Sequence, residues 1–153
     1  RETQDRLLKE QLPGLGDEAR SRNVTFLLEP VNRYESDYLN SIVHAAAITR
    51  EINHPNVAIT ADLFHMQMEE LDPAAALRAA ADQLGFVHVA ENTRVEPGVG
   101  SLDFKSPFTA LQQSGYTNGI ELESRSLSGP ADEVLPRSAA FLRRTWQEEL
   151  SNC

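Results

Sequence analysis

The feature of this sequence that most constrains its fold is a regular alternation of strand patterns with helix patterns. Short runs rich in apolar residues predict strands at 24–29, 57–62, 85–90 and 119–123. Helical spacing, capping residues and first-turn prolines predict helices at 12–22, from 36 or 37 to just before His54, at 72–84, from 106 onward and at 132–150. Such alternation is typical of a parallel sheet with helical crossovers, so we expect an α/β fold.

Two prolines and the segment after Asp62 add detail to the expected helices and loops. Pro13 is tolerable in the first turn of its helix, whereas Pro136 indicates a break or a late start in the last helix. The segment after Asp62 is polar and is expected to be a loop. The length of 153 residues suits a single domain.

The net charge limits the partners that this chain can have. Lys and Arg together number 14 and Asp and Glu together number 23, which gives a net charge of −9. This charge opposes nonspecific phosphate binding and adhesion to anionic membranes, so we expect neither nucleic acid nor membrane as a partner. We find no apolar run of about 18 residues that would span a membrane and no leader pattern. The single cysteine, Cys153, allows no internal disulfide, and we expect a cytoplasmic protein.

Residues of one chemical kind stand at the ends of the predicted strands. Glu29 ends the first strand, Asp62 ends the second, His88 lies in the third, and Glu121 and Glu123 lie in the fourth. In a parallel sheet these ends lie on one side, where α/β folds place their ligands. Converging carboxylates and an imidazole need a cation, and this ligand set suits manganese, cobalt, magnesium or zinc. The sequence therefore predicts a divalent metal site.

Each of these residues also has an ordinary structural explanation. A single strand-end carboxylate more often caps a helix or anchors a loop, and a single strand histidine is usually a hydrogen-bonded core residue. The same coincidence at four separate strands favours the metal site over these explanations.

Four strings carry a resemblance to a known family. They are "LEPVNRYES", "DLFHM", "HVAENTRVEPGVGSLDF" and "GYTNGIELES", in this order along the chain. With them the chain resembles the sugar phosphate isomerase/epimerase family, the xylose-isomerase-like TIM barrels. It is most similar to the ketose 3-epimerases that act on tagatose- or psicose-type sugars.

This resemblance implies a TIM (β/α)8 barrel of which the chain supplies only part. The family's barrel has eight strands in about 250 residues or more, whereas four strands are predicted here, and the matched strings belong to strands five to eight. We therefore expect residues 1–153 to form an incomplete xylose-isomerase-like domain, the C-terminal half of a barrel. A truncated gene, a partial record and pairing of two half-barrels in a homo-oligomer are alternative explanations.

The resemblance also assigns roles to individual residues. It implies one divalent ion, most often Mn2+, and a catalytic pair formed by Glu29 and Glu123. Glu123 is preferred to Glu121 because the family's glutamate lies seven residues beyond a tyrosine, here Tyr116. The implied metal ligands are Glu29, Asp62, His88 and Glu123, and the implied substrate contacts are Glu35, His65 and Arg94.

These substrate contacts have plain alternatives as well. Arg94 could pair at the surface with Glu91 or Glu96, and Glu35 could be an acid favoured by the start of a helix. His65 could be a loop residue without a task. Asn32 and Arg33 belong to the first string but receive no role.

The function implied by the resemblance is ketose 3-epimerisation by two-glutamate proton transfer through an enediolate. A hydroxypyruvate-type aldose–ketose isomerase uses the same two-glutamate plan and is the nearest alternative. An apurinic endonuclease is a second alternative, which the negative charge opposes. A non-catalytic half-barrel is the third, and it belongs to a different class of protein.

Overall fold

The computed structural model describes residues 2–150, so Cys153 lies outside the described part of the chain. In chain order the elements are α1 (Glu2–Ser21), β1 (Phe26–Leu28), α2 (Ile42–Ile52), β2 (Val57–Asp62), α3 (Leu63–Glu69), α4 (Pro73–Ala80), a 3-10 turn (Ala81–Gln83), β3 (Leu84–Val89), α5 (Lys105–Gln113), β4 (Ile120–Leu122) and α6 (Ala131–Leu150).

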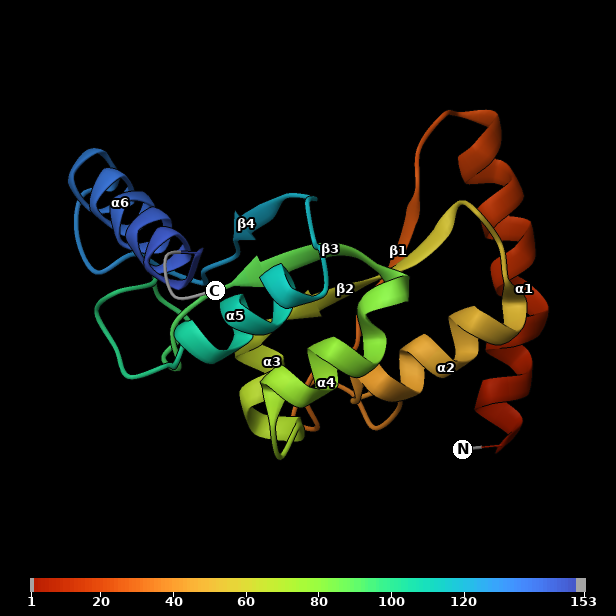
Figure 1. Ribbon diagram of the computed structural model, residues 1–153. Coiled ribbons are helices and arrows are strands. Elements are labelled where there is room, and N and C mark those ends of the chain that lie inside the picture. The colour runs from red at the N-terminus through yellow and green to blue at the C-terminus, as the bar shows by residue number, and fades with distance from the viewer. Residues whose placement is uncertain (1, 151–153) are drawn as a thin grey trace.

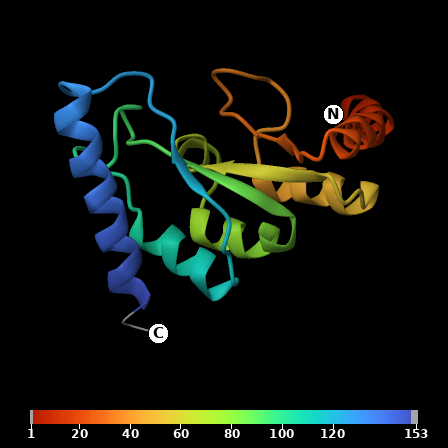
Figure 2. The ribbon, with the colours of Figure 1, turned by 90° about the horizontal axis from the view of Figure 1, so that it is seen from above.

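The strands form one four-stranded sheet in the order β1-β2-β3-β4. Each neighbouring pair is parallel, and each crossover between consecutive strands contains at least one helix. Figures 1 and 2 show α2, α4 and α5 side by side along the sheet, with α1 beyond β1 and α6 beyond β4. The predicted α/β fold with parallel strands is confirmed.

Alternation along the central strands creates two different faces of the sheet. Val57, Ile59 and Ala61 of β2 are buried in the hydrophobic core, together with Val87 and Val89 of β3. The side chains between them point to the opposite face because successive residues of a strand alternate. At the carboxyl ends, the strand residues on that opposite face are the polar ones described below.

The helix boundaries differ from the predicted ones at the start of the chain. The first helix was predicted over 12–22 but is the longer α1, so Pro13 lies inside the helix and not in its first turn. The helix predicted from 36 or 37 begins only at Ile42. Its first backbone N–H is bound at 2.9 Å by Glu70 Oε1, a capping partner from a distant segment. As predicted, it ends before His54, with Asn53 in the left-handed conformation.

Three further predictions about helices differ from the structure. The expected loop after Asp62 is helix α3, whose first turn is capped by Asp62 itself through a 2.8 Å bond from Phe64 N–H. The helix predicted over 72–84 ends at Ala80 and is followed by the 3-10 turn and β3. Pro136 lies inside α6 without interrupting it.

No helix within residues 2–150 combines the length and the apolar character that crossing a bilayer requires.

Candidate metal centre

Four side chains from four different strand ends meet on the face of the sheet opposite the hydrophobic core, which we call the open face. Glu29 follows β1, Asp62 ends β2, His88 lies in β3 and Glu123 follows β4. One ligand atom of each lies within 4.8 Å of the ligand atoms of the other three. The backbone explains the convergence, because Asp62 pairs with His88 across the sheet and the Glu123 N–H donates to the Val89 carbonyl at 3.0 Å. These four residues form a group that could hold a metal ion.

The imidazole of His88 lies between the two glutamates. Its Nδ1 is 3.4 Å from Glu29 Oε1 and 3.2 Å from Glu123 Oε2. Glu121 belongs to β4 and pairs with His88 in the sheet, but it is not part of the group. Strand alternation puts Glu121 and Glu123 on the same face and does not separate them, whereas the three-dimensional arrangement does.

Asp62 is the most buried member of the group, with 1% of its surface exposed. One carboxylate oxygen caps α3, whereas the other, Oδ2, is buried and has no hydrogen-bond partner. Burial, reinforced by the charges of Glu29 and Glu123, raises the pKa of Asp62 to about 7. An unpaired carboxylate oxygen at this depth is costly unless a cation compensates its charge.

Glu29 is a second carboxylate of the group with a raised pKa. Burial raises its pKa above the ordinary value, the nearby His88 opposes that effect, and the charge of Glu123 adds to it. The group thus collects more negative charge than its one histidine can balance. The donor set of carboxylate oxygens and one imidazole nitrogen fits a divalent cation such as Mn2+, Mg2+, Co2+ or Zn2+.

The three residues expected to contact a substrate lie on three connections at this end of the sheet. Glu35 is in the loop after β1, His65 is in α3 and Arg94 is in the loop after β3. Arg94 Nη1 donates to Glu35 Oε1 at 2.8 Å, and its guanidinium lies 4.7 Å from the centre of the Phe64 ring. Arg94 adopts a positive φ of 60°, which turns the loop at this residue. Its ion-pair partner is Glu35, and not Glu91 or Glu96, the partners considered from the sequence.

His65 is 2% exposed, and Asn32 in the loop after β1 contacts its ring. Its Nδ1 lies 2.8 Å from Asn32 Nδ2 and 3.3 Å from the Asn32 backbone nitrogen. Its Nε2 lies 3.5 Å from Asp62 Oδ2, which is too long for a strong hydrogen bond. Burial lowers the pKa of His65, which favours the neutral ring.

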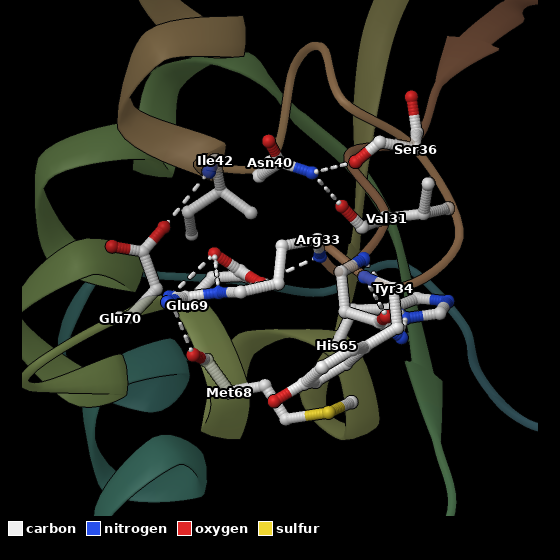
Figure 3. A network of polar contacts seen from close by, with 11 residues as sticks. Val31, Arg33, Tyr34, Ser36, Asn40, Ile42, His65, Met68, Glu69 and Glu70 are labelled. Atoms are coloured by element: carbon white, nitrogen blue, oxygen red, sulfur yellow. Dashed lines mark hydrogen bonds and ion pairs between the residues drawn. The ribbon is translucent and has the colours of Figure 1, made fainter.

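The β1 loop is fastened to α3 by Arg33 and Glu69, as Figure 3 shows. The backbone and guanidinium of Arg33 donate to the Glu69 carboxylate, and Arg33 Nη2 also donates to the Met68 carbonyl at 3.1 Å. The hydrogen bonds from Arg33 lower the pKa of Glu69. Within the loop, Asn40 Nδ2 donates to the carbonyls of Val31 and Ser36. This network fixes the segment that carries Glu35.

The β3 loop is built around a second buried carboxylate, Glu91, which is 1% exposed. Its oxygens accept from the Gly98 N–H at 2.9 Å and the Leu102 N–H at 3.1 Å. Gly100 leaves room for it, because a Cβ there would lie 2.4 Å from Glu91 Oε2. Gly98 has a φ of 100°, a conformation that glycine adopts without the steric cost that other residues meet.

Glu96 joins the β3 loop to the segment before α6. Its side chain is fully buried and accepts hydrogen bonds from the backbone and the hydroxyl of Ser128. Burial alone would raise its pKa, but these hydrogen bonds lower it overall, with help from Arg137 at 3.6 Å. Sequence reasoning identified Arg94 on this loop, considered Glu91 and Glu96 only as its surface partners, and gave Asn32 no role. Their partners are backbone groups and loop residues that no periodic pattern reveals.

The chain is similar to a known protein family over most of its length. A family profile described as "Xylose isomerase-like TIM barrel" matches residues 1–145. Among curated proteins, the L-ribulose 3-epimerase of Mesorhizobium japonicum is 36% identical over 140 residues, which cover 92% of this chain and 47% of that protein. The ketose 3-epimerase of Arthrobacter globiformis is 37% identical over 134 residues, 88% of this chain and 46% of that protein. The chain thus spans about half the length of the curated relatives it matches.

Solved structures agree with the sequence comparison. The apo 3-keto-D-glucoside 4-epimerase of E. coli superposes with a TM-score of 0.84 and 32% identity, covering 92% of this chain and 53% of that one. The D-psicose 3-epimerase of Clostridium cellulolyticum, solved with D-tagatose, gives a TM-score of 0.82 at 26% identity, covering 90% and 55% of the two chains.

Proposed function

The chain belongs to the xylose isomerase-like TIM barrel family, and from this membership we propose that it is a divalent-metal-dependent sugar epimerase. We propose a ketose substrate and inversion at C3, as the names of its L-ribulose and ketose 3-epimerase relatives suggest. The observation that carries the proposal is the group of four ligand atoms within 4.8 Å, which includes an unpartnered buried oxygen of Asp62.

We further propose that residues 1–153 are the C-terminal half of a TIM barrel, strands five to eight. The chain has four consecutive parallel strands, and it covers 47% and 46% of the length of the two relatives described above. In a complete barrel the open face of this sheet would face the interior, where side chains fill the space.

The proposed metal ligands are Glu29, Asp62, His88 and Glu123. A divalent ion bound there would supply Lewis acidity, which makes a C–H bond beside the ketose carbonyl easier to deprotonate. Glu29 follows β1 and Glu123 follows β4, so the two carboxylates come from opposite ends of the sheet order. In the proposal one removes the proton from C3 and the other returns a proton to the opposite face of that carbon, which inverts it.

Burial raises the pKa of Glu29 above its ordinary value, which makes its carboxylate a stronger base than that of an exposed glutamate. His65, Arg94 and Glu35 are the proposed sugar-binding residues. His65 and Arg94 would donate hydrogen bonds to sugar oxygens and to negative charge that develops on them, while Glu35 holds Arg94 in place.

The test is turnover of ketoses by the manganese-loaded protein in D2O, with NMR analysis of the product. We expect deuterium at C3 and formation of the C3 epimer. Glu29→Gln and Glu123→Gln should each lower kcat/KM by about 100-fold or more, the usual contribution of general acid–base groups. Glu121→Gln is the matched control, because Glu121 is a glutamate two residues before Glu123 that lies outside the group, and it should retain wild-type activity.

A second outcome has support among the relatives. A protein of E. coli that is 36% identical over 82% of this chain is a 3-dehydro-D-guloside 4-epimerase. Deuterium at C4 would show that the inverted carbon is C4 and not C3. Conversion of a ketose to an aldose would favour a hydroxypyruvate-type isomerase. Absence of exchange at every carbon, in protein shown to contain the metal, would contradict the proposed epimerase.

A further inference from the structure

Asn32 is a buried polar residue that joins the three proposed sugar-binding side chains. It is 2% exposed and follows β1 in the loop that also carries Glu35. Its Nδ2 lies 2.8 Å from His65 Nδ1 and 3.0 Å from Glu35 Oε1. Glu35 Oε1 in turn accepts from Arg94 Nη1 at 2.8 Å. One carboxamide is therefore in direct contact with His65 and Glu35 and reaches Arg94 through Glu35.

The orientation of this carboxamide is fixed by a neighbouring backbone group. Asn32 Oδ1 accepts a hydrogen bond from the Tyr34 N–H at 3.0 Å. A backbone N–H can only donate, so the oxygen of the amide must face Tyr34 and the NH2 group must face His65 and Glu35. The two hydrogens of the NH2 group then match the two acceptors.

The same reasoning fixes the position of the hydrogen on His65. The Asn32 backbone N–H points at His65 Nδ1 from 3.3 Å, and the Asn32 NH2 group does so from 2.8 Å. Because both groups are donors, Nδ1 must be an acceptor, and in the neutral ring the hydrogen is on Nε2. Nε2 is the nitrogen on the side of Asp62, 3.5 Å from its Oδ2. A donor therefore points toward the metal-binding group.

We propose that Asn32 is a positioning residue for sugar binding: its NH2 group keeps the hydrogen of His65 on Nε2 and holds the Glu35 carboxylate that pairs with Arg94. This inference rests on the proposed function for what His65 and Arg94 bind, but the hydrogen-bond pattern itself is independent of any reaction. Asn32 does not contact the reacting atoms in this scheme and acts only through its two partners.

The sharpest test is Asn32→Asp, which keeps the shape of the side chain but replaces the NH2 group by a carboxylate oxygen. That oxygen would face His65 Nδ1 and Glu35 Oε1, so Nδ1 should acquire a hydrogen and Glu35 should be repelled. The readout is nitrogen-15 NMR of the histidine rings, which distinguishes Nδ1–H from Nε2–H, at a pH well above the usual histidine pKa. His65 is one of 4 histidines, and its signals are assigned with a His65→Gln variant.

Asn40→Asp is the matched control. It makes the same chemical change in the same loop, where Asn40 Nδ2 donates to the Val31 and Ser36 carbonyls and not to His65 or Glu35. We expect Asn40→Asp to lower stability but to leave the hydrogen of His65 on Nε2. If the epimerase activity is found, Asn32→Asp should lower kcat/KM by about 10- to 100-fold, as for other residues that orient a site. Asn40→Asp is the control for the His65 spectrum alone, because Asn40 holds the loop that carries Glu35.

The wild-type spectrum alone can overturn the proposal, since a hydrogen on Nδ1 of His65 would contradict it without any variant. An Asn32→Asp protein that is folded but keeps the wild-type His65 spectrum would also contradict it. Failure of the proposed function has a different signature: no turnover by the wild-type protein, whatever the His65 spectrum shows.

Discussion

At the scale of single residues, Asp62 divides two tasks between its two carboxylate oxygens. One oxygen caps α3 through Phe64 N–H, and the other is buried without a partner beside Glu29, His88 and Glu123. The first task is structural and stabilises the fold. The second leaves a charge without compensation in the metal-free protein, which is the kind of local cost that functional sites carry.

Replacement of Asp62 by Asn should therefore stabilise the metal-free protein. Asn keeps a side-chain oxygen for the α3 cap but carries no charge. The folded-state pKa of Asp62, about 7, lies above its ordinary value of 3.8, so folding takes up a proton between these values and the charged form is penalised above pH 7. We expect Asp62→Asn to raise the free energy of unfolding at pH 8 by on the order of 2 kcal/mol.

This gain has a defined pH dependence. It should shrink as the pH falls below 7 and vanish well below pH 3.8, where the wild-type carboxyl is neutral in both the folded and the unfolded state. Urea unfolding of chelator-treated protein at several pH values measures it. A difference that is constant with pH, or a variant less stable than wild type at pH 8, would contradict the account. Added Mn2+ should stabilise the wild type and not the variant.

Residue positions could be predicted where they follow from strand order, and not where they depend on loops. Glu29, Asp62 and His88 were identified because parallel strands bring their carboxyl ends together. Glu121 and Glu123 could not be separated by alternation, and the choice of Glu123 came from the family resemblance. The contacts of Asn32 and Glu91 depend on loop conformations that hydrogen bonds between distant segments determine.

At the scale of elements, the alternation of helices and strands was predictable and the boundaries were less so. Helix α3 was missed because the segment after Asp62 was taken to be polar, although Leu63 and Met66 are buried and the Asp62 side chain is the N-cap. The late start of α2 reflects capping by Glu70, a residue that comes after the helix in sequence. Such boundaries depend on tertiary contacts that local propensity does not contain.

The close pairing of β3 with its neighbours gives a prediction about Gly85. Gly85 lies where the β2–β3 register shifts, and a Cβ there would meet Leu27 Cδ2 at 2.5 Å and Ala58 Cβ at 2.8 Å. The Ala58 Cβ is attached directly to the backbone and cannot move away. We expect Gly85→Ala to lower the free energy of unfolding by about 1–3 kcal/mol, as overpacking does.

Gly14→Ala is the matched control for this change. Gly14 lies in α1, and a Cβ there would meet nothing within 4 Å. This substitution should raise stability by about 0.5–1 kcal/mol, because alanine favours the helix over glycine. Thermal or urea unfolding of both variants decides the matter, and equal effects of the two substitutions would disprove the predicted crowding at Gly85.

At the scale of the whole molecule, the sheet has two strands with one neighbour each. In the described part of the chain β1 pairs with β2 alone and β4 with β3 alone, whereas β2 and β3 have partners on both sides. A free edge presents unpaired backbone groups that favour pairing with another strand. That this sheet is part of a barrel was predicted only through the family resemblance, because nothing in the strand patterns themselves sets the number of strands in a barrel.

Hydrogen exchange of the isolated 153-residue chain tests this description. We expect the amides of β2 and β3 to exchange slowly and those of β1 and β4 to exchange markedly faster, because edge strands open more readily. The measurement is residue-resolved amide exchange by NMR at two protein concentrations. Equal protection of all four strands would show that another strand, such as one from a second copy, covers the edges.

The central claim is that the residues at four strand ends hold one metal ion between them. Anomalous X-ray diffraction from crystals grown with Mn2+, recorded on both sides of the manganese absorption edge, tests it most directly. We expect one anomalous peak at about 2.0–2.3 Å from an oxygen or nitrogen of each of Glu29, Asp62, His88 and Glu123, as for other divalent ions with such ligands. A protein saturated with Mn2+ that shows no peak among these four side chains would contradict the account.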